Sequence, residues 1–309
     1  FKNVSKIAAL SDIHGQYEKL AGLIKTLGYW ETNGAWRQAG HKAIFVGDLI
    51  DRGPQQVNTV NLVRNMVEAG AAECIMGNHE FNAIAWATPD PCVPGEFLRQ
   101  HGRAGNRHQH QAFLSEVEGT LLHGELVSWF KTLPLWLDLG DIRIVHACWN
   151  DAYMEQLKPF VGAQKTLTDE LILWSSQEGH WAFVAVEALC KGLEVDLPIG
   201  ASFHDKDGQV RRKMRLRWWE QDFSTYRKAA LVASDIIDQI PDTPMPADSR
   251  VKVYEGPPVF FGHYWQVGKP LLFRDNVACV DYSAGKGGAL VAYRWGGEPI
   301  LNQSNFIQF

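Results

Sequence analysis

Residues 42–53 read KAIFVGDLIDRG, an apolar run that ends in a glycine and an aspartate. The apolar part, Lys42–Val46, has the length of a buried strand, and the glycine marks the turn where it ends. Apolar residues at helical spacing then follow over 57–67. Other apolar runs that lead into polar residues are Ile7–Leu10, followed by helical spacing over 17–27, and Cys74–Met76. This alternation predicts strand–helix–strand crossovers and a largely parallel sheet.

The second half of the chain has a different pattern. A strand is predicted at Ile142–Val145, and 151–250 is then interpreted as a mainly helical, cap-like insertion within a single domain spanning 1–309. Short segments of β character follow, separated by turn residues, and they predict a second sheet built as an antiparallel meander. These segments are Val251–Tyr254, Val259–Phe261, Leu271–Phe273, Val277–Val280 and Ala289–Trp295.

Composition excludes several classes of protein. Of the 309 residues 46% are hydrophobic and 21% are charged, which is typical of a globular domain. The net charge of −5 argues against a stable nucleic-acid partner held by bulk electrostatics. The 5 cysteines form no C-x-x-C pair, which favours a reducing compartment. No apolar run suits a signal peptide or a membrane span, so we expect a cytoplasmic protein without a membrane partner.

Polar residues of a particular kind follow the predicted strands. They are carboxylates, imidazoles and an amide, a mixed nitrogen and oxygen set that suits manganese, iron or zinc. A loop aspartate such as Asp48 has two oxygens and could bridge a pair of cations. Paired cations about 3.5–4 Å apart are a known solution for phosphoester hydrolysis. The residues are Asp12, His14, Asp48, Asp51, Arg52, Asn78, His79, His146 and His263.

In their order along the chain, these residues form blocks that resemble those of the calcineurin-like metallophosphoesterases, and in particular the bacterial and phage members of the phosphoprotein phosphatase family. The resemblance implies a four-layer α/β/β/α sandwich of two mixed sheets. It spans most of the chain. The blocks are Asp12-Ile-His14-Gly15, Gly47-Asp48-Leu-Ile-Asp51-Arg52-Gly53, Gly77-Asn78-His79-Glu80, His146-Ala147 and Gly262-His263.

The resemblance also implies a role for each residue. Asp12, His14 and Asp48 would hold one divalent cation, and Asp48, Asn78, His146 and His263 would hold the other, with manganese preferred and iron or zinc compatible. Arg52 would clamp the phosphate through its planar guanidinium, and Asn78 would also contact the substrate. His79 would be the general acid, oriented by Asp51, and a metal-bound hydroxide would attack phosphorus.

The sequence departs from the family pattern at several positions. Trp265 stands where many relatives have a second histidine, and Asp281-Tyr282-Ser283 stands where relatives usually have Asp-Thr-Gly. Ser176 stands where phage-type enzymes have a phosphate-binding arginine. We therefore consider Arg215 and Arg217, within the basic run 211–217, as alternative substrate-binding residues.

Several functions stay open at this point. The main hypothesis is a phosphomonoesterase similar to bacterial protein serine/threonine phosphatases, acting on a phosphoprotein or a nucleotide. The alternative is a hydrolase of dinucleoside polyphosphates such as diadenosine tetraphosphate. A different class is a phosphoester-binding module without turnover. The polar segment Arg99–His110 is interpreted as a solvated rim loop rather than a dedicated binding segment. The oligomeric state is not indicated.

Overall fold

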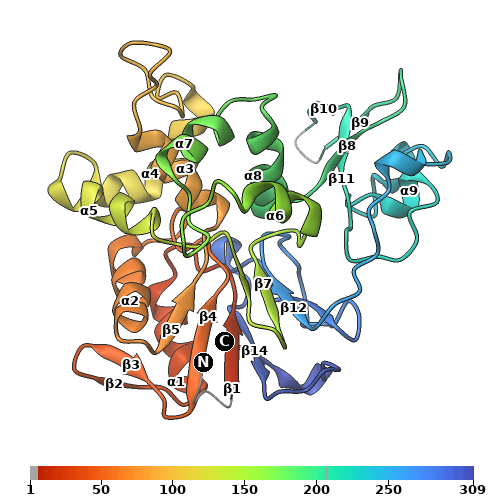
Figure 1. The fold of residues 1–309 in the computed structure, drawn as a ribbon. Helices are drawn as coiled ribbons and strands as arrows, with labels where there is room; N and C mark the ends of the chain where they lie inside the picture. Colours follow the sequence, from red (N-terminus) through yellow and green to blue (C-terminus); the bar gives the residue numbers. More distant parts are fainter. Residues whose placement is uncertain (1–5, 206–207) are drawn as a thin grey trace. The chain divides into compact units, whose positions relative to one another are not determined.

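The computed structural model describes residues 6–205 and 208–309, and this part of the chain forms two compact units. The first unit comprises Phe1–Cys190 and Pro257–Phe309, and the second comprises Lys191–Gly256. Every sequence block that resembles the metallophosphoesterases belongs to the first unit. In Figure 1 the first unit is coloured from red to green and then in blue.

The first sheet has the strand order β15-β14-β1-β4-β5. Its centre is parallel, and the pairing aligns Leu10 with Phe45 and Phe45 with Cys74. The carboxyl ends of β1, β4 and β5 therefore meet at one edge, where ligands bind in sheets of this kind. The strands are β1 (Lys6–Leu10), β4 (His41–Phe45), β5 (Ala72–Cys74), β14 (Val291–Trp295) and β15 (Phe306–Gln308), with a separate hairpin of β2 (Trp30–Thr32) and β3 (Ala35–Arg37).

The second sheet has the strand order β13-β12-β7-β6. Its strands are β6 (Trp136–Asp138), β7 (Arg143–Val145), β12 (Val259–Phe261) and β13 (Val277–Cys279). β12 runs parallel to both β7 and β13, and β6 is antiparallel to β7. The prediction of an antiparallel meander is therefore wrong. The last predicted segment, as β14, pairs antiparallel with β1 in the first sheet.

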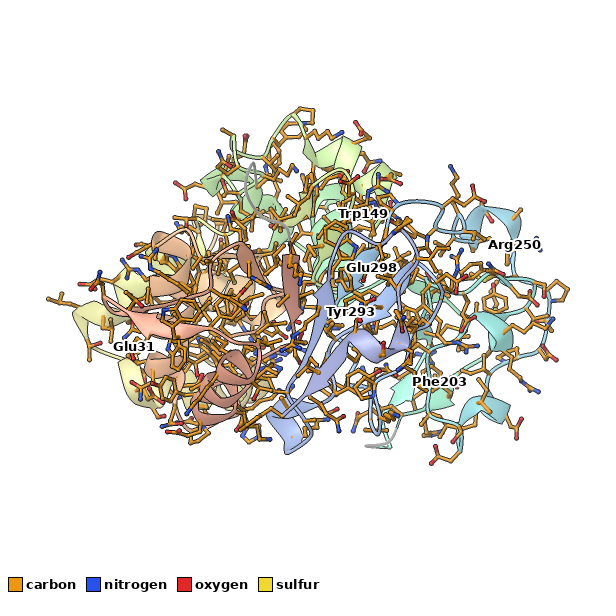
Figure 2. All side chains as sticks on the ribbon, turned by 90° about the horizontal axis from the view of Figure 1, so that it is seen from below. Glu31, Trp149, Phe203, Arg250, Tyr293 and Glu298 are labelled. Atoms are coloured by element: carbon orange, nitrogen blue, oxygen red, sulfur yellow. The ribbon has the colours of Figure 1, made fainter. Side chains whose placement is uncertain are left out.

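The sheets pack face to face around a shared apolar core. Branched residues of β1 and β4, such as Ile7 and Ile44, form one cluster with Ile144 and Phe260 of the second sheet. Tyr293 is fully buried in the same cluster, and Figure 2 shows it among the side chains that fill the interior. Burial of this apolar surface is the main stabilising contribution to such a core.

Helices cover the outer faces and complete the predicted α/β/β/α sandwich. α1 turns buried leucines such as Leu20 and Leu23 inward, and α2 packs against β5. The backbone N–H of Ala147, just after the strand of the second sheet that ends at Val145, donates to the carbonyl oxygen of Leu189 in α8 at 2.8 Å. The helices of the first unit are α1 (Tyr17–Thr26), α2 (Gln56–Glu68), α3 (Asn78–Ala87), α4 (Ala104–Val117), α5 (Leu121–Phe130), α6 (Asp151–Leu157), α7 (Asp169–Ser175) and α8 (Trp181–Lys191).

The second unit differs from the predicted insertion in extent and in structure. The longer helices of 151–250, α6 to α8, belong to the first unit up to Cys190. The second unit has its own core, in which Met214, Phe223 and Ile240 are buried. It is built mainly from short elements: β8 (Glu194–Asp196), β9 (Phe203–His204), β10 (Val210–Arg211), β11 (Lys213–Arg215), α9 (Tyr226–Ala229) and the 3₁₀ turns Ile237–Gln239 and Ala247–Ser249.

Candidate metal centre

The structure brings the predicted metal ligands together at the carboxyl ends of the strands. Asp12 and His14 follow β1, Asp48 follows β4, Asn78 begins α3 after β5, and His146 follows β7. His263 follows β12. Among the described residues, His14, Asp48 and His79 form one group with metal-ligand spacing, and Asp48, His146 and His263 form another. The ligand atoms of each group lie within 4.8 Å of one another.

Asp48 lies between these groups. Its Oδ2 atom is 3.8 Å from the Nε2 atom of His14 and 3.4 Å from the Nε2 atom of His146. Its Oδ1 atom accepts a hydrogen bond from the backbone N–H of His79 at 3.0 Å. This position between groups is the one that a bridging carboxylate requires.

A second set of ligand atoms converges on the amide oxygen of Asn78. The Oδ1 atom of Asn78 lies 2.9 Å from Nδ1 of His263 and 3.2 Å from Nε2 of His146. In a neutral imidazole, Nδ1 of His263 or Nε2 of His146 has a lone pair for a cation when the proton is on the other ring nitrogen. Their convergence suits a cation with nitrogen and oxygen ligands.

Unpaired buried atoms also indicate that a cation fits here. Among the described residues, Oδ1 of Asp12 and Nε2 of His14 are buried and have no hydrogen-bond partner. The other ring nitrogen of His14, Nδ1, lies 2.9 Å from the carbonyl oxygen of Ile50. A hydrogen bond from Nδ1–H to that carbonyl leaves the Nε2 lone pair directed at the site. The Nδ1 atom of His146 likewise lies 2.7 Å from a carbonyl oxygen, that of Val46, but its Nε2 atom lies 3.2 Å from Oδ1 of Asn78.

The ligand loops adopt strained backbone conformations. His14, Asp48 and His263 have positive φ angles of 51°, 52° and 70°. Non-glycine residues rarely adopt this region, and such strain is concentrated at functional sites. The loops also approach closely, since a Cβ atom on Gly262 would lie 1.9 Å from Oδ1 of Asp12.

Glu80 ties these loops together. Its carboxylate accepts hydrogen bonds from the backbone N–H groups of Asp48 and Leu49, both at 2.8 Å, and of Gly77 at 3.0 Å. It therefore connects the loop after β4 to the start of α3. Burial raises the pKa of Glu80 to about 7, and the Asp48 carboxylate adds to this effect. The sequence block containing Glu80 was recognised, but this role was not predicted.

His79 and Asp51 form a chain of hydrogen bonds with a third residue, His110. Nδ1 of His79 lies 2.5 Å from Oδ2 of Asp51, and Nδ1 of His110 lies 2.8 Å from Oδ1 of Asp51. His110 is buried on α4, so the interpretation of Arg99–His110 as a solvated rim loop is wrong for its helical part, whereas most other residues of the segment are exposed. The spacing of His110, Phe113 and Val117 on one helix face was the signal that could have revealed it.

The carboxylates near His79 favour the protonated, positively charged form of its imidazole. Burial by itself lowers the pKa of His79, but the carboxylates of Asp48 and Asp51 outweigh it and raise the pKa. Burial also opposes ionisation of Asp51, yet its hydrogen bonds with the two imidazoles lower its pKa to about 2. These two carboxylates therefore favour the protonated form of His79 beside the ligand cluster.

Arg52 lies at the exposed edge of the centre with two other side chains. The guanidinium carbon of Arg52 is 4.5 Å from the centroid of the Trp265 ring, and Nζ of Lys286 is 3.6 Å from it. Trp265 is 37% exposed. Its backbone N–H donates to Oδ2 of the buried Asp281 at 2.7 Å, which fixes the loop that presents the indole.

The other candidate arginines are found in the second unit. Arg215 and Arg217 belong to the second unit, where they pair with Glu194 and Glu220. Arg217 also donates to the carbonyl oxygen of Lys228 at 2.6 Å. Their assignment as substrate-binding residues stays a prediction.

Fold and ligand cluster together define a metallophosphoesterase. The chain belongs to the calcineurin-like phosphoesterase family, whose sequence profile matches residues 5–204. Among the described residues, no helix has the length and apolar character needed to cross a bilayer.

Relatives of known name match about half of the chain. A bis(5′-nucleosyl)-tetraphosphatase (asymmetrical) of Geobacillus sp. (strain WCH70) is 45% identical over 145 residues, which cover 46% of this chain and 57% of that protein. The enzyme of the same name from Bacillus subtilis (strain 168) is 30% identical over 141 residues, covering 45% and 55%. The chain thus spans little more than half the length of these relatives.

A solved structure resembles the whole chain in fold. It is a protein serine/threonine phosphatase from Saccharomyces cerevisiae, which is 14% identical, with a TM-score of 0.51. The match covers 99% of this chain and 79% of that one. At this identity the likeness shows the fold alone.

Proposed function

We propose that this chain hydrolyses nucleoside polyphosphates of the bis(5′-nucleosyl) tetraphosphate class. This is the alternative from the sequence analysis, and the names of the relatives favour it over a protein phosphatase. The observation that carries the proposal is the partly exposed Trp265 indole with the Arg52 guanidinium and the Lys286 ammonium over its ring. Indole rings and guanidinium planes stack nucleobases, and cations at such a ring hold phosphates.

The metal ligands proposed are those of the sequence analysis, with Asp48 shared between two cations. Oxygen and imidazole ligands suit manganese, and also iron or zinc. Divalent cations at such a site supply Lewis-acid polarisation of phosphoryl oxygens and a nucleophile at neutral pH. The unpaired Oδ1 atom of Asp12 and Nε2 atom of His14 support this assignment.

The residues beside the cluster have separate roles in the reaction. Arg52 holds the phosphoryl group through paired N–H donors. Water attacks phosphorus, the bond to the leaving oxygen breaks, and Nε2–H of His79 gives that oxygen its proton. Asp51 keeps the imidazole oriented through Nδ1, and His110 fixes the second oxygen of Asp51. His110 is therefore a positioning residue.

The substrate preference is tested by comparing kcat/KM for diadenosine tetraphosphate, a phosphoserine peptide and p-nitrophenyl phosphate with manganese present. We expect diadenosine tetraphosphate to be preferred. Loss of one stacking contact costs about 1–3 kcal/mol. Trp265→Ala should therefore lower kcat/KM for diadenosine tetraphosphate about tenfold or more, and Trp265→Phe should retain most of it.

Hydrolysis of p-nitrophenyl phosphate is the internal control, because this substrate has no nucleobase. It should change little in either Trp265 variant. A preference for the phosphopeptide, or equal losses on all three substrates, would show that Trp265 does not select a nucleotide. Absence of turnover on every substrate would favour the binding-module hypothesis.

A further inference from the structure

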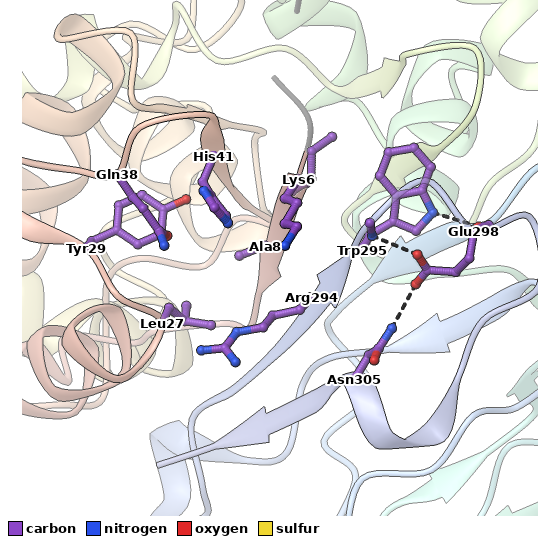
Figure 3. Close-up of a pocket in the computed structure, with 12 residues that line it drawn as sticks. Lys6, Ala8, Leu27, Tyr29, Gln38, His41, Arg294, Trp295, Glu298 and Asn305 are labelled. Atoms are coloured by element: carbon purple, nitrogen blue, oxygen red, sulfur yellow. Dashed lines mark hydrogen bonds between the residues drawn. The ribbon is translucent and has the colours of Figure 1, made fainter. Parts of the chain in front are cut away.

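A cavity of about 450 Å³ lies at the other end of β1 from the metal centre. β1 begins at Lys6, and Asp12 lies just beyond its carboxyl end. At a rise of about 3.3 Å per residue, some 20 Å of extended chain separate these residues. Figure 3 shows side chains of the cavity wall, which is formed by residues including Lys6, Leu27, Tyr29, His41, Arg294 and Trp295.

The wall of this cavity is rich in positive charge. The cations Lys6 and Arg294 line it together with His41, and within 6–205 and 208–309 no carboxylate forms an ion pair with Lys6 or Arg294. One guanidinium nitrogen of Arg294, Nη2, donates to the carbonyl oxygen of Thr26 at 3.0 Å. The Nδ1 atom of His41 lies 2.9 Å from the carbonyl oxygen of Ala39, so its Nε2 atom remains available.

The acidic residue of the wall, Glu298, is already engaged. Its Oε1 atom accepts hydrogen bonds from the Tyr293 hydroxyl at 3.0 Å and from the Asn305 amide at 2.9 Å. Its Oε2 atom accepts the backbone N–H of Gly296 at 2.7 Å. Glu298 therefore belongs to a local turn, and the cavity keeps a positive balance.

Buried polar atoms without partners point to a ligand. In the described part of the chain, the Tyr29 hydroxyl and Oε1 of Gln38 are buried and make no hydrogen bond. Tyr29 is only 3% exposed, and both Tyr29 and Gln38 line the cavity. A buried hydroxyl without a partner destabilises the fold unless a ligand or a water satisfies it. Burial raises the pKa of Tyr29 well above its usual value, so the hydroxyl is a donor at neutral pH.

We propose that this cavity binds a phosphate monoester the size of a nucleoside monophosphate. Lys6 and Arg294 hold the phosphate dianion, with Tyr29 donating a further hydrogen bond. Two fixed cations and a histidine match a dianion better than a monocarboxylate. The apolar residues Leu27 and Trp295 provide surface for a flat ring. The volume is within the range of about 300–1,000 Å³ that small-molecule sites occupy.

The test uses the methylenephosphonate analogue of adenosine monophosphate, which has no ester bond to hydrolyse. Its binding to the manganese-loaded protein is measured by isothermal titration calorimetry. We expect binding that is at least tenfold weaker in Arg294→Gln and in Tyr29→Phe, since each removes a hydrogen bond to a charged group. Arg64→Gln, which changes an arginine of α2 outside the cavity, is the matched control and should bind normally.

The variant Arg52→Ala distinguishes binding of the analogue at the cavity from binding at the metal centre. Binding at the cavity should persist in this variant, and Arg294→Gln should hydrolyse p-nitrophenyl phosphate at the wild-type rate. The proposal is overturned if Arg52→Ala abolishes binding while the cavity variants retain it. It is also overturned if the wild type shows no binding at about 1 mM analogue.

Discussion

The contacts of His79 allow its proposed role as a proton donor to be tested by a single substitution. Its Nδ1 atom is bound to Asp51, and its Nε2 atom lies 3.9 Å from Oδ2 of Asp48. The raised pKa of His79 keeps its proton available near neutral pH. These features support the proposal that His79 protonates the leaving oxygen, although it also lies within metal-ligand distance of His14 and Asp48.

Replacing His79 with glutamine should therefore impair only substrates whose leaving group needs a proton. We expect His79→Gln to lower kcat on phenyl phosphate by about 10²–10⁴-fold. The loss on p-nitrophenyl phosphate should be much smaller, because nitrophenolate leaves without a proton. Steady-state kinetics on both substrates, with elemental analysis of bound metal, provide the measurement. Equal losses on both substrates, or loss of metal, would assign His79 to metal binding instead.

The pKa of His146 leads to a prediction of how metal binding depends on pH. Burial alone lowers the pKa of His146, but the Asp48 carboxylate outweighs it and raises the pKa to about 10 in the metal-free protein. His146 is then protonated near pH 7 and must lose its proton to bind a cation. By contrast, burial lowers the pKa of His14 to about 3, with the nearby His79 adding to this effect, so His14 is already neutral.

Manganese binding should accordingly release protons and tighten as the pH rises from about 6 to 9. Isothermal titration calorimetry in two buffers with different ionisation enthalpies measures the number of protons released. Identical observed enthalpies in both buffers, or weaker binding at higher pH, would rule out a protonated His146 in the metal-free state.

The sequence predicts the position of a site residue where that residue belongs to a recognisable motif. The ligands and His79 stand in short blocks at strand ends, so their convergence could be predicted without coordinates. The roles of Glu80 and His110 could not be predicted. Glu80 accepts hydrogen bonds from backbone N–H groups, and His110 contacts the carboxylate of Asp51, and these groups come close together only in the folded chain. Arg215 was chosen only because it lies in a basic run.

The loops after β1 and β12 illustrate how tightly neighbouring elements are packed. A Cβ atom on Gly262 would lie 1.9 Å from Oδ1 of Asp12 and 2.9 Å from Cγ2 of Val46. Gly262→Ala should therefore displace Asp12 and weaken manganese binding about 10–100-fold, the range seen when ligand positioning is lost. Equilibrium dialysis with manganese gives the affinity.

Gly124→Ala is the matched control for this substitution. Gly124 lies within α5, where an added Cβ atom meets nothing within 4 Å, so the change should leave metal binding intact and slightly favour the helix. Wild-type affinity in Gly262→Ala would mean that the Asp12 loop tolerates displacement and that the close packing is not needed for the site.

Prediction of the elements succeeded where periodicity is local. The apolar spacing over 17–27 and 57–67 corresponds to α1 and α2. Prediction failed for strand pairing, because the alternation of apolar and polar residues within one strand does not indicate which other strand pairs with it. β14 therefore joined the first sheet, and β12 paired in parallel with β7 across more than 100 residues of chain.

For the whole molecule, the order of the motifs was sufficient to predict the sandwich. The extent of the second unit was not predictable, because α6 to α8 and Lys191–Gly256 differ from the flanking sequence in similar ways. The proposed substrate class rests on relatives that match less than half of this chain and on Trp265. The ligand cluster, in contrast, lies entirely within the first unit.

The central claim is that Asp48 holds two cations at once. Elemental analysis of manganese in protein purified with this metal tests it most directly, with circular dichroism to verify folding. We predict two manganese ions per chain in the wild type, one in His14→Ala and one in His263→Ala, and far less than one in Asp48→Ala. A folded Asp48→Ala protein that still binds one or two ions per chain would contradict the shared site.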